Sequence, residues 1–149
     1  AMSVASKVME IFDGIGMFCV EMFVTKDNEI LVNEVAPRPH NSGHYTIEGC
    51  ITSQFENHIR AIVGLPLGDT SLICPTVMIN LLGEDGYTGK TMVAGLDEAM
   101  ALKGVSVHIY GKRDTKPKRK MGHITVTANS VSKAKLIAEE AYKYIKIKA

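Results

Sequence analysis

The chain has 149 residues, of which 46% are hydrophobic and 22% are charged, and its formal net charge is +1. This composition is ordinary for a soluble globular protein, the length allows one domain or two small lobes with a real core, and the near-zero charge excludes a protein whose whole surface binds a polyanion. No stretch approaches the roughly 20 apolar residues of a membrane span and no signal peptide is visible, so we expect no membrane partner.

Residues 1–12 are predicted to form a helix, because apolar residues recur on one face at helical spacing: Val4, Val8, Ile11 and Phe12. A chain that opens inside a helix, with an alanine before its first methionine, indicates a piece cut from a longer protein. The glycine-containing run at 13–16 then breaks the helix, and residues 16–25 and 30–36 are predicted to form a β-hairpin.

Two glutamates, Glu21 and Glu34, are predicted to face each other across this hairpin. Asp27 and Asn28 tolerate the positive φ that a tight turn needs, and a two-residue turn there places the glutamates in register. Opposed Cβ atoms lie roughly 4.5–5.5 Å apart, where like charges destabilise the sheet, and unpaired charge is costly within apolar runs. A bound Mg²⁺ ion, which prefers oxygen ligands, would resolve both costs. The alternative is that each glutamate faces solvent or pairs with a lysine or arginine elsewhere.

The second strand is predicted to end in a loop over residues 37–44, because its two prolines remove hydrogen-bond donors and restrict the residues before them. Arg38 can bind phosphate or carboxylate through paired hydrogen bonds, and Asn41 offers an oxygen to a metal or an amide to a substrate. Taken alone, the loop is a rigid surface connection with incidental polar residues. Beside Glu21 and Glu34, and with two histidines as well, it is interpreted as the wall of a ligand site.

A helix is predicted to follow, with Thr46 as its N-cap and a stop at residues 64–66. Its apolar residues recur at a spacing that predicts one buried stripe, formed by Ile47, Ile51, Phe55, Ile59 and Ile62. Residues 67–75 connect this part to the rest of the chain, and we place a lobe boundary there.

The second lobe is predicted to hold three strands, at residues 76–82, 105–110 and 122–128, and a short helix at residues 96–102. Ser130 is a candidate N-cap for a last helix, whose apolar face is formed by Ala134, Ile137, Ala138, Ala141 and Ile145. The fold class predicted from these elements is α+β with mostly antiparallel sheet.

Positive charge is concentrated in residues 112–120, which hold six lysines and arginines against Asp114 alone. This segment carries a net +5, which leaves −4 for the rest of a chain whose total is +1. The segment lacks the interleaved aromatic residues of a base-stacking surface, so a solvated loop is favoured over nucleic-acid binding. A sharper interpretation is recognition of a single phosphate group by two or three converging cations.

The three cysteines, Cys19, Cys50 and Cys74, lie far apart in the sequence. Their number is odd and each lies in an apolar stretch, which fits neither a disulfide framework nor the ligand spacing of a zinc site. We therefore expect buried free thiols in a protein of a reducing compartment.

Three stretches together resemble one family: GMFCVEMFV at 16–24, NEVAPRPHNSGHYT at 33–46, and YGK at 110–112 followed by RKMGHI at 119–124. They resemble the N5-carboxyaminoimidazole ribonucleotide synthetases, which are ATP-grasp ATPases of purine biosynthesis and in some organisms are fused to the carboxylase that acts next. The resemblance runs from about residue 4 to residue 126 and covers only the C-terminal part of the family enzyme.

The resemblance implies that the chain has two parts. Residues 1–70 would be the C-terminal part of an ATP-grasp domain with the metal site. Residues 71–149 would be a small β-rich C-terminal lobe with the substrate-phosphate loop and a terminal helix. The N-terminal domains of the parent enzyme, which include the glycine-rich ATP loop, have no counterpart here, so the chain alone is expected to be inactive.

The resemblance also implies a reaction and roles for single residues. The enzyme would carboxylate 5-aminoimidazole ribonucleotide with bicarbonate through carboxyphosphate, giving N5-carboxyaminoimidazole ribonucleotide, ADP and phosphate. The ligands of Mg²⁺ (or Mn²⁺), which bridges the phosphates of the co-substrate ATP, would be Glu21 and Glu34. The catalytic residues would be Arg38 and His40, which would face the reacting bicarbonate and aminoimidazole, and Asn41, which would lie close to the metal and the phosphates. The 5′-phosphate of the nucleotide would be bound by Lys112, Arg119 and Lys120.

The expected parent protein is a homodimer of the cytoplasm, or of the plastid stroma in a plant, and a fused carboxylase domain can follow this part. Nucleic acid is not expected as a partner. Two alternatives stay open. One is another ATP-grasp ligase, such as a formate-dependent glycinamide ribonucleotide transformylase, which shares the paired glutamates and a similar loop. The other is a noncatalytic binding or assembly module that kept the fold.

Overall fold

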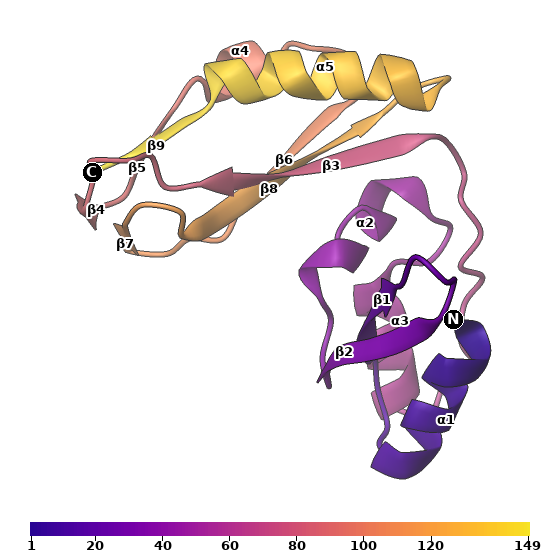
Figure 1. Ribbon diagram of the computed structural model, residues 1–149. Helices are drawn as coiled ribbons and strands as arrows, with labels where there is room; N and C mark the ends of the chain where they lie inside the picture. The colour runs from indigo at the N-terminus through magenta and orange to yellow at the C-terminus, as the bar shows by residue number, and fades with distance from the viewer. The chain divides into compact units, whose positions relative to one another are not determined.

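The computed structural model describes residues 1–149, and the chain folds into two compact units. Unit 1 comprises residues 1–47 and 51–71, and unit 2 comprises residues 48–50 and 72–149. Helices and antiparallel strands occur in both units, which confirms the predicted α+β class (Figure 1). None of the helices combines the length and the apolar character needed to cross a lipid bilayer.

Unit 1 begins with helix α1 (Met2–Phe12), close to the predicted range. The helix ends at Asp13, whose left-handed backbone (φ 43°) lets its N–H donate to the Met9 carbonyl. The elements that follow are strands β1 (Cys19–Val24) and β2 (Ile30–Ala36), the 3₁₀ turn η1 (Asn41–Gly43), and helices α2 (Thr46–Gly49) and α3 (Gln54–Ile62). Helix α2 crosses from unit 1 into unit 2.

The hairpin places Glu21 opposite Glu34, as predicted, but by a different route. The turn has three residues instead of two: the Thr25 N–H donates to the Glu29 carbonyl at 2.9 Å, and Asn28 takes the left-handed conformation (φ 60°). This turn shifts the strand register by one residue, and a β-bulge directly after Glu21 shifts it back. The predicted turn is therefore wrong, while the register that it was used to derive is confirmed.

The single helix predicted after Thr46 is wrong, because two short helices flank residues 50–53. Ser53 caps α3, since its side chain accepts a backbone N–H from the first turn of that helix at 3.1 Å. The Thr46 hydroxyl is engaged elsewhere: it donates to the Gly43 carbonyl at 2.6 Å and accepts the Gln54 N–H at 2.9 Å. The side-chain bonds of Thr46 and Ser53 to the backbone interrupt the helix and start α3, although the spacing of the apolar residues predicts one continuous helix.

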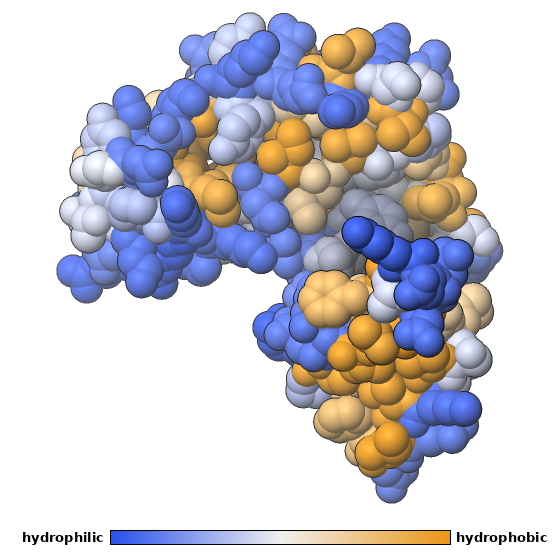
Figure 2. Space-filling model, in the orientation of Figure 1, coloured by the Kyte–Doolittle hydropathy of each residue, from blue (hydrophilic) through white to orange (hydrophobic).

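The apolar stripe predicted to be buried lies on the surface of unit 1. Ile51, Ile59 and Ile62 are each more than half exposed, whereas Gln54 and Asn57 are buried. Large apolar side chains are also exposed on α1 and on the hairpin, and Figure 2 shows hydrophobic residues gathered over this unit. The buried amides of Gln54 and Asn57 bond to backbone instead of packing an apolar core, and the apolar side chains around them stay exposed.

Unit 2 is built on a three-stranded antiparallel sheet in the order β3-β8-β6. Its strands lie close to the predicted ranges: β3 (Thr76–Leu82), β6 (Val105–Ile109) and β8 (Lys120–Thr127). One face of the sheet is covered by helices α4 (Leu96–Met100) and α5 (Val131–Tyr144) (Figure 1). Two short strand pairs that the sequence did not predict are β4 (Gly89–Lys90) with β7 (Asp114–Thr115), and β5 (Met92–Ala94) with β9 (Lys146–Lys148).

The hydrophobic core lies between α5 and the sheet of unit 2. Ala134, Ala138 and Ala141 on α5 are fully buried, and these small residues let the helix approach the sheet closely. They belong to the two core clusters that contain Ile124 and Val126 of β8. The predicted serine cap of α5 is confirmed, and so is its buried alanine face.

Substitution of Ile124 by alanine is expected to destabilise unit 2 by about 2–5 kcal/mol. The side chain is fully buried in the middle strand of the sheet, so the substitution removes apolar burial and leaves a cavity. Chemical denaturation of the 149-residue chain measures the change. Leu136→Ala, on the exposed side of α5, is the control, with an expected change within about 0.5 kcal/mol. Equal losses in the two variants would contradict this placement of the core.

All three cysteines are free thiols, as predicted. Cys50 is buried, and burial raises the pKa of its thiol. Cys19 and Cys74 are half-buried, so the predicted burial holds for Cys50 alone.

Candidate functional site

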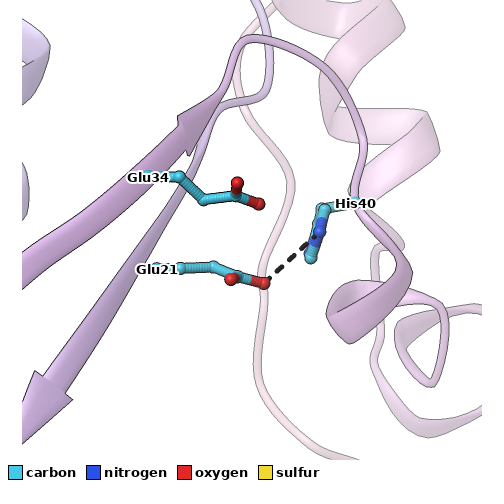
Figure 3. A group of neighbouring side chains, drawn as sticks. All are labelled: Glu21, Glu34 and His40. Atoms are coloured by element: carbon cyan, nitrogen blue, oxygen red, sulfur yellow. Dashed lines mark ion pairs between the residues drawn. The ribbon is translucent and has the colours of Figure 1, made fainter.

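The side chains of Glu21, Glu34 and His40 converge beside the hairpin (Figure 3). The two glutamates are register partners on β1 and β2, and the histidine comes from the loop that follows β2. One ligand atom from each residue lies within 4.8 Å of the others. Two carboxylates this close repel each other unless a cation or a proton lies between them. The arrangement therefore has the geometry of a site for a cation.

The ring of His40 is oriented by its own loop. Ser42 donates its backbone N–H to Nδ1 at 3.3 Å, and the Ser42 hydroxyl lies 2.9 Å from the same nitrogen. Because Nδ1 accepts a hydrogen bond, the neutral ring carries its proton on Nε2, which lies 3.4 Å from Glu21 Oε1. His40 thus turns its Nε2 side toward Glu21. The two carboxylates are the better ligands for a hard divalent cation.

Gln54 fixes the loop that carries His40, a role that the sequence analysis missed. Its side chain is buried, its Oε1 accepts the His40 N–H at 2.9 Å, and its Nε2 donates to the His40 carbonyl at 2.8 Å. The same Nε2 lies 2.9 Å from His44 Nδ1. A Cβ on Gly43 would lie 2.5 Å from Gln54 Oε1, so a side chain at this position would displace the Gln54 amide. One buried amide therefore holds the loop backbone beside the glutamates.

Arg38 and Asn41 lie on either side of His40 in the same loop, so the three residues predicted to be catalytic share one short segment. Arg38 is exposed and donates Nη1–H to the Pro39 carbonyl at 3.1 Å. A guanidinium has five N–H donors, so this bond leaves others for an anionic ligand. Asn41 is half-buried at the start of η1.

The residues predicted to bind phosphate lie in unit 2, whereas the glutamates belong to unit 1. Lys112 and Arg119 are half-buried, unlike the other four cations of residues 112–120, which include Lys120 and are exposed. Lys112 Nζ donates to the Lys120 carbonyl at 2.5 Å, and Arg119 Nη1 donates to the Asp114 carbonyl at 2.6 Å. Two of the six cations, Lys112 and Arg119, are thus half-buried and held against backbone carbonyls, and the other four are exposed.

Two family models match separate regions of the chain. Residues 1–55 match the ATP-grasp domain, and residues 76–136 match the phosphoribosylaminoimidazole carboxylase C-terminal domain. The N5-carboxyaminoimidazole ribonucleotide synthase of Bacillus subtilis is 50% identical over 125 residues, which cover 84% of this chain and 31% of that protein. The chain therefore spans about a third of the length of this relative.

Solved structures of N5-carboxyaminoimidazole ribonucleotide synthetases are also similar to this chain. The crystal structure of N5-carboxyaminoimidazole ribonucleotide synthetase from Thermotoga maritima is 58% identical with a TM-score of 0.89, over 99% of this chain and 41% of that one. N5-carboxyaminoimidazole synthase from Aspergillus clavatus, solved in complex with ADP and 5-aminoimidazole ribonucleotide, is 40% identical with a TM-score of 0.82. The latter match covers 95% of this chain and 38% of that one.

Proposed function

Because this chain belongs to the N5-carboxyaminoimidazole ribonucleotide synthetase family of ATP-grasp enzymes, of which it covers the C-terminal part, we propose that it serves a ligase of purine biosynthesis. The ligase carboxylates 5-aminoimidazole ribonucleotide with bicarbonate and converts ATP to ADP and phosphate. The observation that carries the proposal is the register of Glu21 with Glu34, within the stretch that matches the ATP-grasp domain. The nucleotides bound in the Aspergillus clavatus structure support the choice of substrates.

In this proposal Glu21 and Glu34 would hold a divalent cation, Mg²⁺ or Mn²⁺, at the ATP site. The donor set fits such an ion, because two facing carboxylates supply hard oxygen ligands and the remaining positions can be filled by phosphate. When bound, the cation neutralises charge on the phosphoryl oxygens. His40, whose Nε2 lies 3.4 Å from Glu21 Oε1, is proposed to orient that carboxylate.

Arg38 and Asn41 are proposed to face the anions of the reaction. A bicarbonate oxygen attacks the γ-phosphorus of ATP and ADP leaves; the substrate amine then attacks the carbon of the carboxyphosphate and phosphate leaves. The Arg38 guanidinium matches the planar bicarbonate because it can donate two parallel hydrogen bonds. The fixed loop holds these donors in place before the charge develops, which lowers the barrier without reorganisation.

Lys112, Arg119 and Lys120 are proposed to bind the 5′-phosphate of the nucleotide. Lys112 and Arg119 are already held by backbone carbonyls, so they lose less side-chain entropy on binding an anion than a freely moving lysine does. The smaller entropy cost supports Lys112 and Arg119 over the exposed Arg113, Lys116 and Lys118 of the same segment.

The chain is proposed to need the rest of an ATP-grasp enzyme for activity. Unit 1 exposes large apolar side chains on α1, the hairpin and α3, and both hydrophobic core clusters lie in unit 2. The solved Thermotoga maritima chain is more than twice as long as this one, since the match covers 41% of it. The additional part of such an enzyme would cover the apolar surface of unit 1 and complete the ATP site.

A chimera tests the proposal. In it, this chain replaces the matching 41% of the Thermotoga maritima synthetase, to which it is 58% identical. ADP release is measured with ATP, Mg²⁺ and bicarbonate, with and without 5-aminoimidazole ribonucleotide, and the 149-residue chain is assayed in parallel. We expect the nucleotide to stimulate ADP release by the chimera and no release by the chain alone. ADP release that the nucleotide leaves unchanged would contradict the substrate and favour another ATP-grasp ligase.

A further inference from the structure

A row of side chains in unit 2 leads from the buried sheet toward Lys112. His123, on the middle strand β8, is 2% exposed and lies opposite His108 of β6. The two imidazole rings stack, with centroids 4.4 Å apart and planes inclined by 13°. His108 Nε2 in turn lies 2.6 Å from Glu48 Oε1. Strand pairing, ring stacking and this ion pair together hold the His123 ring in one position.

Tyr110 connects the row to Lys112. Its hydroxyl lies 2.9 Å from His123 Nδ1, so one end of the phenol is anchored on a buried group. Lys112 Nζ lies 5.6 Å from the centroid of the same ring, within the range of a cation–π contact. The ammonium also donates to the Lys120 carbonyl. The ring and the carbonyl therefore restrain a side chain that is otherwise among the most flexible in proteins.

We propose that Tyr110 and His123 are positioning residues for Lys112. The hydrogen bond to His123 fixes the Tyr110 ring, and the ring fixes the ammonium that receives the 5′-phosphate of the substrate. This inference rests on the proposed function, in which Lys112 binds that phosphate. It adds Tyr110 and His123 to the proposed phosphate site, where they act only by holding Lys112 in place.

Unit 2 contains a second lysine over a tyrosine ring, which supplies a matched control. Lys148 Nζ lies 5.4 Å from the centroid of Tyr87, nearly the distance found for the first pair. Both of these residues lie outside the cation segment at residues 112–120. Tyr87→Phe therefore removes a tyrosine hydroxyl beneath a lysine without touching the proposed phosphate site.

The position of Lys112 is measured first by NMR, on the 149-residue chain without substrate. The ring current of Tyr110 is expected to move the Lys112 ε-methylene protons upfield of those of the exposed Lys116. Tyr110→Leu should abolish this shift and His123→Leu should reduce it. His123→Asn should retain it, because the asparagine side chain keeps a hydrogen-bonding atom at the place of Nδ1. Lys112 protons at the same chemical shift as those of Lys116 would overturn the proposal.

The effect on substrate binding is measured as KM in the chimera. Tyr110→Phe is expected to raise KM for 5-aminoimidazole ribonucleotide about 3- to 10-fold, the change expected from one lost hydrogen bond. The value of kcat and KM for ATP should stay within about twofold, because Lys112 is proposed to contact neither ATP nor the reacting groups. Tyr87→Phe should change none of the three.

A double variant separates positioning from a general structural role. In a Lys112→Met background, Tyr110→Phe should have no further effect, because the group that it positions is gone. An effect of the same size in that background, a rise in KM for ATP, or no effect of Tyr110→Phe at all would each overturn the inference. A chimera that the nucleotide fails to stimulate would instead count against the proposed function, and the NMR shift would still decide the position of Lys112.

Discussion

Replacement of Glu34 by glutamine in the chimera is expected to lower nucleotide-stimulated ADP release by about 10²-fold or more. The substitution keeps the size of the side chain but removes one of the two carboxylates that face each other across the hairpin. A neutral amide oxygen is a weaker ligand for a hard divalent cation, so the Mg²⁺ concentration at half-maximal rate should rise at least about tenfold. Both quantities come from the ADP assay run over a Mg²⁺ titration.

Glu29→Gln is the matched control, because Glu29 is an exposed glutamate at the turn of the same hairpin and lies outside the converging group. Stability gives an independent readout. Without divalent cations, the chain carrying Glu34→Gln should be at least as stable as the unsubstituted chain, because a like-charge pair across two strands is removed. A loss of rate with an unchanged Mg²⁺ requirement would show that Glu21 and Glu34 do not share a cation.

Substitution of Arg119 by methionine is expected to raise KM for 5-aminoimidazole ribonucleotide by about 10- to 100-fold, with a smaller change in KM for ATP. Arg119 is half-buried, and its bond to the Asp114 carbonyl uses one of five N–H donors and leaves others for a phosphate. Hydrogen bonds to charged groups contribute about 1.5–3 kcal/mol, which corresponds to that range of KM. Initial rates of the chimera over a titration of each substrate measure the two constants.

Arg113→Met removes the same charge from the same segment at an exposed position, and its expected effect is less than about twofold because solvent screens it. Arg119→Lys should fall between the two, since it keeps the charge but loses the planar fork. Equal effects of Arg113→Met and Arg119→Met would mean that the basic segment acts through its overall field, and would contradict a built phosphate site.

The facing glutamates could be predicted from the sequence only because two irregularities of the hairpin cancel. The residues between the strands mark where the chain reverses, but Asn28 fits a two-residue and a three-residue turn equally well. The bulge after Glu21 restores the register, and no residue around it signals a bulge in advance. A hairpin register read from turn chemistry alone is therefore uncertain by one residue, and one residue reverses the face of every side chain.

Unit 2 follows its sequence pattern closely because its strands and α5 bury one continuous face. The alanine face of α5 and Ile124 of β8 are fully buried. The spacing of apolar residues in the sequence therefore matches the face that each element buries. The short pair β5 and β9 could not be predicted, since each strand has three residues and their partners lie more than fifty residues apart. A strand of three residues is too short to show the alternation of apolar and polar residues that predicts a strand.

Unit 1 departs from its pattern because its buried side chains are polar. Gln54 and Asn57 bond to backbone and give no apolar period, while the isoleucines around them face outward. One local signal for the new helix was present: Ser53 followed by Glu56 three residues later is a capping-box pattern. It marks the helix start and puts Gln54 in the first turn, from where the amide reaches the loop of His40.

In the proposed function, the chain serves the transfer of the bicarbonate carbon to 5-aminoimidazole ribonucleotide with consumption of ATP. The most direct test follows that carbon: the chimera is incubated with ATP, Mg²⁺, the nucleotide and radiolabelled bicarbonate, and the label in the nucleotide fraction is compared with the ADP released. We expect one labelled carboxyl group in the nucleotide for each ADP released, and the loss of both products in the Glu34→Gln variant. ADP release without label in the nucleotide would contradict the proposed function.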